Sequence, residues 1–343
     1  MVMNKKRKLT LTDAGIAFLV GFVLSQLLAV IGVSIINQIM SSLGKTEAQI
    51  KLFFDGIWGI LIQTILMDIG FILIFIYYYR KGLNKQSTFA KPTNNNWQYF
   101  GICLLIGVFT LFALAGTLNY FELLVEKLGK SASSLSYEMD SLWKYIVSLI
   151  SLAVLPAICE ELLFRGVIVN CLKQKGYMFA IFMSSIMFAI FHFSLSQLIY
   201  PFCFGIILSV VYLKTKNLLF PILLHFANNA LSVSLQYFTS PSTASTFTHS
   251  SVMLVYAIIT LIIWIYVIHK LILHFKQSEV KSLTSNINEN SNFQSNTSQP
   301  SVTNNTTQST NIQIGPHKTN NTSIFYICLG IMIVLYILLI LIG

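Results

Sequence analysis

The sequence predicts an all-α, polytopic membrane protein, and three observations support this fold class. Of the 343 residues, 55% are hydrophobic and only 10% are charged, whereas a soluble domain carries about 25% charged residues. Many apolar runs reach the ~20 residues that a helix needs to cross the ~30 Å hydrocarbon core of a bilayer. The basic residues gather in alternate connections between these runs. No soluble domain of useful size is left over.

We expect about eight to nine transmembrane helices. The apolar runs cover approximately residues 13–37, 54–79, 97–119, 144–172, 177–195, 197–213, 218–238, 251–273 and 323–342. The fourth run is long for a single span, and the sixth is short. The first run follows a basic start, but it exceeds the about 7–15 apolar residues of a signal peptide and no A-x-A-like site closes it. We therefore expect it to be a retained helix.

The charged residues predict an orientation. Basic residues occupy alternate connections, in the groups Arg80/Lys81/Lys85/Lys91, Lys173/Lys175, Lys214/Lys216 and His269/Lys270/Lys276/Lys281. The connection 120–143 holds most of the acids. By the positive-inside rule we expect a cytoplasmic N-terminus and an outer C-terminus. We expect the membrane to be a bacterial plasma membrane. The net charge of +10 follows from this bias, so the lipid bilayer is the expected partner and nucleic acid is not.

The predicted helices divide the chain into five unequal parts. Residues 1–143 hold the first three helices and an outer connection. Residues 144–238 hold four closely spaced helices, the expected catalytic core. An additional helix at 251–275 precedes residues 276–322, an Asn/Ser/Thr-rich stretch that is too polar to offset its ordering entropy and should be a disordered linker. Residues 323–343 form the last helix. An internal repeat, typical of many transporters, is missing.

The five cysteines do not suggest a disulfide framework or a thiolate metal site. They are Cys103, Cys159, Cys171, Cys203 and Cys328, scattered through apolar runs without a C-x-x-C spacing. We interpret them as small core residues.

One predicted helix carries two carboxylates and a guanidinium at membrane depth, where a charged side chain is costly and usually functional. Glu161 and Arg165 are four residues apart in the favoured acid-first order, so we expect them to pair. Glu160 points about 100° away, has no local cation and is the candidate general base. Pro156 removes one backbone hydrogen bond and can kink the helix beside this site.

Two later helices each carry a histidine at depth. His192 follows Phe188 by four residues near the end of the fifth run, and His225 and Asn229 share a face of the seventh. His192 would assist Glu160 in activating a water. His225 and Asn229 would donate hydrogen bonds to a tetrahedral oxyanion. A single histidine in an apolar helix more often makes an interhelical hydrogen bond, so the hypothesis depends on the combination.

The sequence leaves open the roles of Asp68 and Asn228 and the depth of His192. Asp68, midway along the second run, fits helix packing as well as a functional role, and Asn228 also fits a packing role. Counting about 1.5 Å per residue from the cytoplasmic edge places Glu160 about 9–12 Å deep but His192 roughly 20 Å deep. Tilt, a broken helix or a wrong boundary of the fifth run would remove this gap. The last helix holds none of the motifs, so truncation after about residue 275 should leave an active core.

Three motifs in order resemble those of the CPBP family, also called Abi or CAAX-protease-like, whose eukaryotic member is the type II CAAX prenyl endopeptidase. They are Glu160-Glu161-x-x-x-Arg165, Phe188-x-x-x-His192 and His225-x-x-x-Asn229. The segments Pro201-Phe-Cys-Phe-Gly205 and Asn217-Leu-Leu-Phe-Pro221 resemble the intervening pattern of the family. The resemblance covers about residues 144–238, and no motif position departs from it.

The resemblance implies an intramembrane endopeptidase that hydrolyses a peptide bond of a membrane-associated protein or peptide. Glu160 with His192 would activate water, and His225 with Asn229 would form the oxyanion hole, with no cofactor required. Bacterial relatives are linked to peptide or bacteriocin maturation, self-immunity and regulated membrane proteolysis. A prenylated CAAX substrate is not implied for a bacterial chain.

Other functions would use the same residues. A metalloprotease would bind zinc through Glu160, His192 and His225, although H-E-x-x-H is absent. In either protease, Glu161, Arg165 and Phe188 would support the site. A non-catalytic scaffold or bacteriocin self-immunity protein would keep the helices and bind a peptide. A proton-coupled transporter or a bis-histidine haem protein would use the buried groups differently, and the missing repeats weigh against a transporter.

Overall fold

The computed structural model of the chain describes residues 9–83, 88–127, 139–194, 198–238, 255, 258–259, 261–273 and 322–342. Within these ranges the regular elements are helices. Phe89 and Asn217 also form one isolated β-bridge. Four stretches are long and apolar enough to cross a membrane, namely Leu11–Ser42, Ile57–Lys81, Asn94–Ala115 and Leu142–Lys175. Shorter apolar helices lie beside them. The predicted fold class, an all-α polytopic membrane protein, is confirmed.

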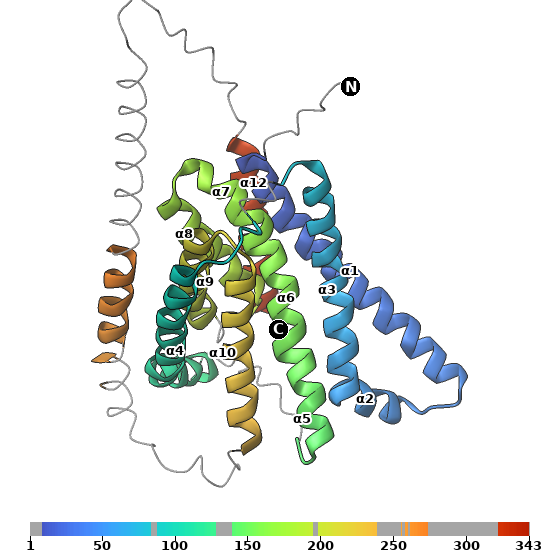
Figure 1. The fold of residues 1–343 in the computed structure, drawn as a ribbon. Helices are drawn as coiled ribbons and strands as arrows, with labels where there is room; N and C mark the ends of the chain where they lie inside the picture. The colour runs from blue at the N-terminus through green and yellow to red at the C-terminus, as the bar shows by residue number, and fades with distance from the viewer. Residues whose placement is uncertain are drawn as a thin grey trace, which may run out of the picture.

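Figure 1 shows the helices in chain order. They are α1 (Leu11–Ser42), α2 (Glu47–Asp55), α3 (Ile57–Lys81), α4 (Asn94–Lys127), α5 (Leu142–Leu149), η1 (Ile150–Val154), α6 (Leu155–Glu161), η2 (Leu162–Val169), α7 (Asn170–Leu172), η3 (Lys173–Lys175), α8 (Tyr177–Phe191), α9 (Ile199–Thr215), α10 (Leu219–Phe238) and α12 (Thr322–Ile342). Residues 261–273 are also helical. The elements from α5 to η3 form one continuous helix, Leu142–Lys175, called the site helix below.

Several helix boundaries differ from the predicted runs. Helices α1 and α4 have 32 and 34 residues, which at ~1.5 Å per residue exceeds a ~30 Å hydrocarbon core. Helix α8 ends at Phe191, four residues before the predicted end. Helix α2 was not predicted, and it begins with a capping box at Thr46. The predicted linker 276–322 lies outside the described residues except at its last position, and the division into five parts stays a prediction.

The first turn of α1 is fixed by local and long-range polar contacts. The Asp13 carboxylate accepts a hydrogen bond from the Thr10 backbone N–H at 2.8 Å. At the C-terminal end of α3, Lys81 Nζ lies 2.8 Å from Asp13 Oδ1, and the Tyr78 hydroxyl donates to the Asp13 carbonyl at 3.1 Å. These contacts join the start of α1 to the end of α3, so the two helices run antiparallel.

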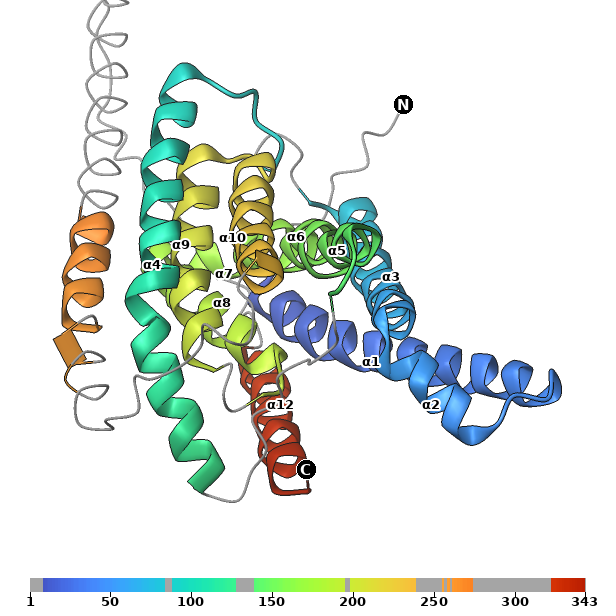
Figure 2. The ribbon, with the colours of Figure 1, turned by 90° about the horizontal axis from the view of Figure 1, so that it is seen from below.

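The site helix lies at the centre of the bundle. Helices α3 and α10 pack against α6, whereas α1 and α8 pack along η2. Helix α9 fills the space between α8, α4 and α10, and α12 lies against α1 and α8 (Figure 2). Helix α12 approaches α1 closely at Gly15, where a Cβ atom would lie 2.9 Å from the Phe325 Cα. A glycine is needed at this crossing.

The buried core and the outer surface are both apolar. Leu163, Phe164, Val167 and Ile168 of η2 have no exposed surface, so the second half of the site helix is the centre of the core. In the C-terminal half of α1, side chains that are more than half exposed include Leu27, Val30, Ile31, Ile35 and Ile39. So large an exposed apolar surface is expected for contact with lipid. The predicted cytoplasmic side of the bundle stays a prediction.

Candidate active site

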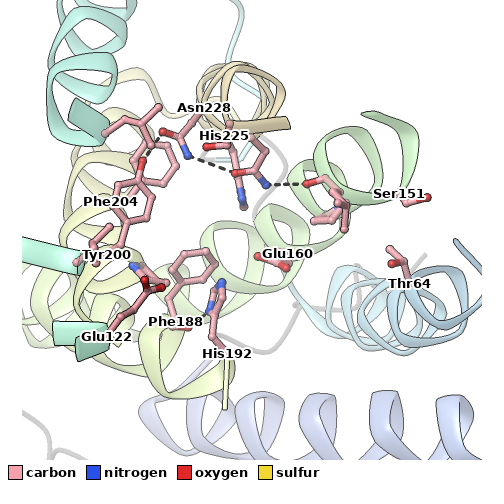
Figure 3. A pocket seen from close by; sticks show the side chains of 17 residues that line it. Thr64, Glu122, Ser151, Glu160, Phe188, His192, Tyr200, Phe204, His225 and Asn228 are labelled. Atoms are coloured by element: carbon pink, nitrogen blue, oxygen red, sulfur yellow. Dashed lines mark hydrogen bonds between the residues drawn. The ribbon is translucent and has the colours of Figure 1, made fainter. Parts of the chain in front are cut away.

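A cavity of about 470 Å³ opens beside the site helix. Its walls come from α3, α4, the site helix, α8, α9 and α10. The four predicted catalytic residues, Glu160, His192, His225 and Asn229, all line this cavity, and so does Phe188 (Figure 3). Residues from three different helices are thus brought together around one space, while their chemical roles stay predictions.

Glu160 and His192 reach the same cavity because the site helix and α8 form a hairpin. The turn contains Gly176 with φ +107°, a backbone conformation that favours glycine. Glu160 and His192 stand sixteen residues before and after Gly176, so two antiparallel helices bring them to a similar level. The depth gap expected from the sequence is therefore absent, because the site helix continues to Lys175 and Glu160 stands as far from the turn as His192 does.

The site helix is widened next to Glu160. The Leu155 N–H donates to the Ile150 carbonyl, five residues earlier, at the end of the π-helical stretch η1, and such turns are frequent at functional sites. In an α-helix the N–H of residue 156 would pair with the Leu152 carbonyl, but Pro156 has no N–H. Asn229 Nδ2 donates to that carbonyl at 3.0 Å instead. The proline thus creates a binding site for a side chain of α10.

Glu161 is completely buried and has two cationic or polar partners. Arg165 Nη1 donates to Glu161 Oε1 at 2.8 Å, as the i, i+4 spacing predicted. His225 Nδ1 lies 2.9 Å from the same oxygen, a contact that the sequence did not suggest. Arg165 Nη2 also donates to the Gly205 carbonyl at 3.1 Å. Glu161 therefore connects the pair on the site helix with the histidine of α10.

This contact orients the imidazole of His225. A carboxylate only accepts hydrogen bonds, so Nδ1 carries the proton and Nε2 is left on the cavity side (Figure 3). The rings of Phe188 and Phe204 contact the imidazole nearly at right angles, each with its centroid 5.9 Å away. A catalytic histidine needs such a partner and such packing to stay in one orientation.

His192 is oriented by its own helix. Its Nδ1 lies 2.8 Å from the Phe188 carbonyl, and since a carbonyl cannot donate, Nδ1 carries the proton. In the neutral imidazole Nε2 then has a lone pair that can accept a proton from water. The Phe188 ring lies 4.9 Å from the His192 ring and 4.7 Å from the guanidinium carbon of Arg165. Phe188 thus separates the two histidines and covers the buried ion pair.

A chain of hydrogen bonds positions Asn229. The Tyr200 hydroxyl donates to Asn228 Oδ1, Asn228 Nδ2 donates to Asn229 Oδ1 at 3.3 Å, and Asn229 Nδ2 donates to the Leu152 carbonyl (Figure 3). Asn228, which the sequence left open as a packing residue, therefore contacts the motif residue directly. Tyr200 had no sequence signal beyond its position near the Pro201–Gly205 segment.

The Glu160 carboxyl is held less firmly. Its Oε2 is buried and has no hydrogen-bond partner among the residues that the structure describes. Glu160 also lines a second, smaller cavity of about 230 Å³ on the side of α3, together with Asp68, Thr64 and His192. Asp68 was left open by the sequence, where its only signal was a charge at membrane depth. The structure places it beside the candidate base.

The residues do not fit a three-donor metal centre. Within the described ranges, no group of three or more His, Cys, Asp or Glu side chains could hold a metal ion. Glu160, His192 and His225 line one cavity, but they do not form such a group. The function proposed below therefore contains no step at a metal.

Comparisons with known proteins agree with this site. The chain is 25% identical over 224 residues to "Putative membrane peptidase YdiL" of Bacillus subtilis (strain 168), an alignment that covers 63% of this chain and 86% of that protein. No solved structure matches the chain. Residues 142–231, from the start of the site helix into α10, match the family described as type II CAAX prenyl endopeptidase Rce1-like and contain all three motifs. The resemblance read from the three motifs is thus confirmed.

Proposed function

We propose that this protein is an intramembrane endopeptidase in which Glu160 activates a water for attack on a peptide bond of a membrane-associated protein or peptide. One observation supports this most strongly. Glu160, with an unpartnered oxygen, lines the same cavity as two oriented histidines and Asn229. A base, an orienting carboxylate and hydrogen-bond donors around one space are the components that acyl transfer to water requires.

The first step is the addition of water to the peptide carbonyl. The Glu160 carboxylate takes one proton of the water, and Nε2 of His192 accepts a hydrogen bond from the same molecule. The water oxygen forms a bond to the carbonyl carbon, and the π electrons move to the carbonyl oxygen. The result is a tetrahedral intermediate with one negative charge on oxygen.

Donors on α10 stabilise that charge. Asn229 uses one amide hydrogen for the Leu152 carbonyl and keeps the other for the oxyanion. His225 is a second donor when Nε2 also carries a proton, in which case Glu161 balances the charge on the ring. The intermediate then collapses, the C–N bond breaks, and Glu160 returns its proton to the leaving amine. Atoms and charge balance, and the carboxylate is regenerated.

The test is turnover of a membrane-anchored fluorogenic peptide by purified wild-type and Glu160→Gln protein, with cleavable sequences found first by comparing the membrane proteomes of the two strains. Loss of a general base lowers turnover by about 10²–10⁴-fold, and we expect the protein level to stay near wild type. Glu47→Gln is the matched control, because Glu47 is exposed in the first turn of α2. A folded Glu160→Gln protein that cleaves at the wild-type rate would contradict the proposal.

The same assay separates the related functions. A scaffold or self-immunity protein would bind the peptide without cleaving it in the wild type. We expect activity to persist in chelators, since Glu160 acts on water directly. About one zinc per chain, lost together with activity and restored with it, would instead support the metalloprotease version.

A further inference from the structure

The smaller cavity shares one wall with the larger one. Thr64, Pro156, Glu160 and His192 line both cavities, so these residues form the boundary between them. The proposed oxyanion donors of α10 line only the larger cavity, whereas Asp68 lines only the smaller one. Glu160 can therefore be approached from two sides.

Asp68 is built into the smaller cavity as a buried acceptor. Its side chain is 5% exposed, and Oδ2 has no hydrogen-bond partner among the residues described. The carboxyl lies close to the thiol of Cys159, the residue before Glu160 on the site helix. Buried polar oxygens are nearly always hydrogen-bonded to protein or ordered water, so Oδ2 is a site for a small polar ligand.

The size and lining of the smaller cavity favour water as that ligand. Its volume of about 230 Å³ would hold several molecules at roughly 30 Å³ each. Thr64, Asp68, Glu160 and His192 provide polar groups on its walls, and the remaining lining is mostly apolar. A water needs two to four polar partners to stay in a buried site, and this cavity supplies them.

We propose that the smaller cavity is the water chamber of the hydrolytic site, and that Asp68 is the residue that positions the attacking water against Glu160. This inference rests on the proposed function. Each turnover consumes one water, while the surrounding lipid supplies none, so an intramembrane hydrolase needs a polar store next to its base. Asp68 Oδ2 shares one hydrogen of the water with Nε2 of His192 in a three-centre hydrogen bond and exchanges no proton itself. Glu160 takes the other hydrogen, and the oxygen faces the substrate carbonyl in the larger cavity.

The first test is Asp68→Asn, which keeps the volume and a hydrogen-bonding group near Cys159 but removes the carboxylate. A hydrogen bond to a charged group is worth enough to change a rate by roughly 10- to 100-fold. We expect kcat to fall by about that factor while KM stays unchanged, because the substrate lies in the other cavity. Asp68→Leu, which also fills the chamber with apolar volume, should lower kcat further.

Two controls and one substitute variant make this result specific. Cys159→Ala removes the thiol next to Asp68 but keeps Asp68, so it should leave kcat close to wild type. Asp13→Asn is the matched substitution at a buried aspartate that pairs with Lys81; it should lower stability without changing kcat of the folded protein. If Asp68→Leu does not fold, Thr64→Val, which removes a hydroxyl at the boundary, should lower kcat several-fold.

The outcomes separate this inference from the proposed function. An inactive Glu160→Gln protein together with an Asp68→Asn protein of wild-type kcat would overturn the water chamber alone. A loss of kcat in Cys159→Ala equal to that in Asp68→Asn would show that Asp68 acts only through packing, and would also overturn it. A rise in KM with unchanged kcat would place Asp68 in substrate binding. An active Glu160→Gln protein would overturn the proposed function itself.

Discussion

The two sides of the larger cavity differ in how their polar groups are held. On α10, His225 is fixed by Glu161, and Asn229 is fixed by Asn228 and the Leu152 carbonyl. On the facing side, Glu160 and the nearby Asp68 each keep an oxygen without a partner in the part of the chain that the structure describes, and both residues line a cavity; Glu161 Oε2 also has no partner there, but Glu161 lines neither cavity. Fixed donors stabilise a developing charge without reorganisation, whereas unpartnered acceptors can bind and release water. We call the side formed by α10 and Glu161 the preorganised wall. We call the side with Glu160 and Asp68, where water can exchange, the exchanging wall.

Two neighbouring glutamates on the site helix produce this difference. Glu160 and Glu161 are separated by about 100° around the helix axis, so they face different surroundings. Glu161 points into the core, where Arg165 and His225 hold one of its oxygens. Glu160 points to the two cavities. One charge maintains the fold and the orientation of a histidine, and the other is available for chemistry.

The largest expected effect is that of Glu161→Gln, which tests the preorganised wall. It removes the negative charge that Arg165 and His225 share and leaves the guanidinium buried without a counter-ion. Breaking a buried pair in this way costs about 3–5 kcal/mol. We expect a strongly reduced yield, a lower unfolding temperature in detergent, and loss of peptide turnover in the fraction that folds.

An exposed ion pair at the N-terminal end of the site helix provides the control for Glu161→Gln. Asp140 and Lys144 have the same four-residue spacing, with Nζ and Oδ2 2.7 Å apart, but they lie at the surface. Exposed pairs contribute little to stability, so Asp140→Asn should leave both unfolding temperature and turnover unchanged. If Glu161→Gln were equally silent, the buried pair would not be what holds this wall together.

The second effect concerns the donors of the oxyanion hole. Asn229→Ala and His225→Ala should each lower kcat by about 10²–10³-fold with little change in KM, because the donors act mainly in the transition state. Both address one oxygen, so the double variant should lose less than the sum of the single losses in free energy. Steady-state kinetics with a fluorogenic peptide would measure this. A change in KM alone at both positions would show that they bind substrate in the ground state.

Pro156 offers a way to separate the two hydrogen bonds of Asn229. Asn229→Ala leaves the Leu152 carbonyl without its donor, so stability should fall as well. Adding Pro156→Ala restores a backbone N–H four residues after Leu152 and allows an ordinary helical turn. We expect the unfolding temperature to recover in the double variant while kcat stays low. Recovery of kcat as well would show that Asn229 acts only as a partner for the backbone.

The sequence alone predicts the parts of this site that depend on local geometry. The apolar runs indicate the helices, and the i, i+4 spacing gives the Glu161–Arg165 pair, since 3.6 residues per turn place such residues on one face. Contacts between helices are not contained in that pattern. The bond from Glu161 to His225 joins residues 64 positions apart, and the place of Asp68 beside Glu160 depends on the rotation of α3 against the site helix.

The remaining mismatches also have physical causes. The depth of Glu160 was misjudged, because the site helix extends to Lys175 before the turn and so places Glu160 as far from the turn as His192. The contact of Asn229 with Leu152 requires the π-helical turn beside Pro156, and a proline predicts only that a hydrogen bond is lost. The sequence therefore indicates the candidate catalytic residues better than it indicates the side chains that position them.

The smallest expected effect lies at α12, which the sequence suggested to be dispensable. This helix packs on α1 and α8, and the Tyr336 hydroxyl donates to the Ser194 carbonyl at 3.2 Å, two residues after His192. Phe193 lies between His192 and Ser194 in the chain. Its ring stacks on that of Phe22 with the centroids 4.1 Å apart, and its centroid lies 5.8 Å from that of the Tyr336 ring. Helix α12 thus supports the segment that carries the second catalytic candidate of the exchanging wall.

Tyr336→Phe removes this one hydrogen bond and keeps the ring. A hydrogen bond of this kind contributes about 0.5–1.5 kcal/mol, so we expect a small drop in unfolding temperature and a decrease in kcat of a few-fold at most. Truncation after residue 275 should lower turnover somewhat more without abolishing it, since the motif residues remain. Tyr326→Phe is the control, because Tyr326 is on the same helix but is 52% exposed. If Tyr336→Phe and the truncated chain both match the wild type in kcat, α12 has no influence on His192, and the exchanging wall is complete without it.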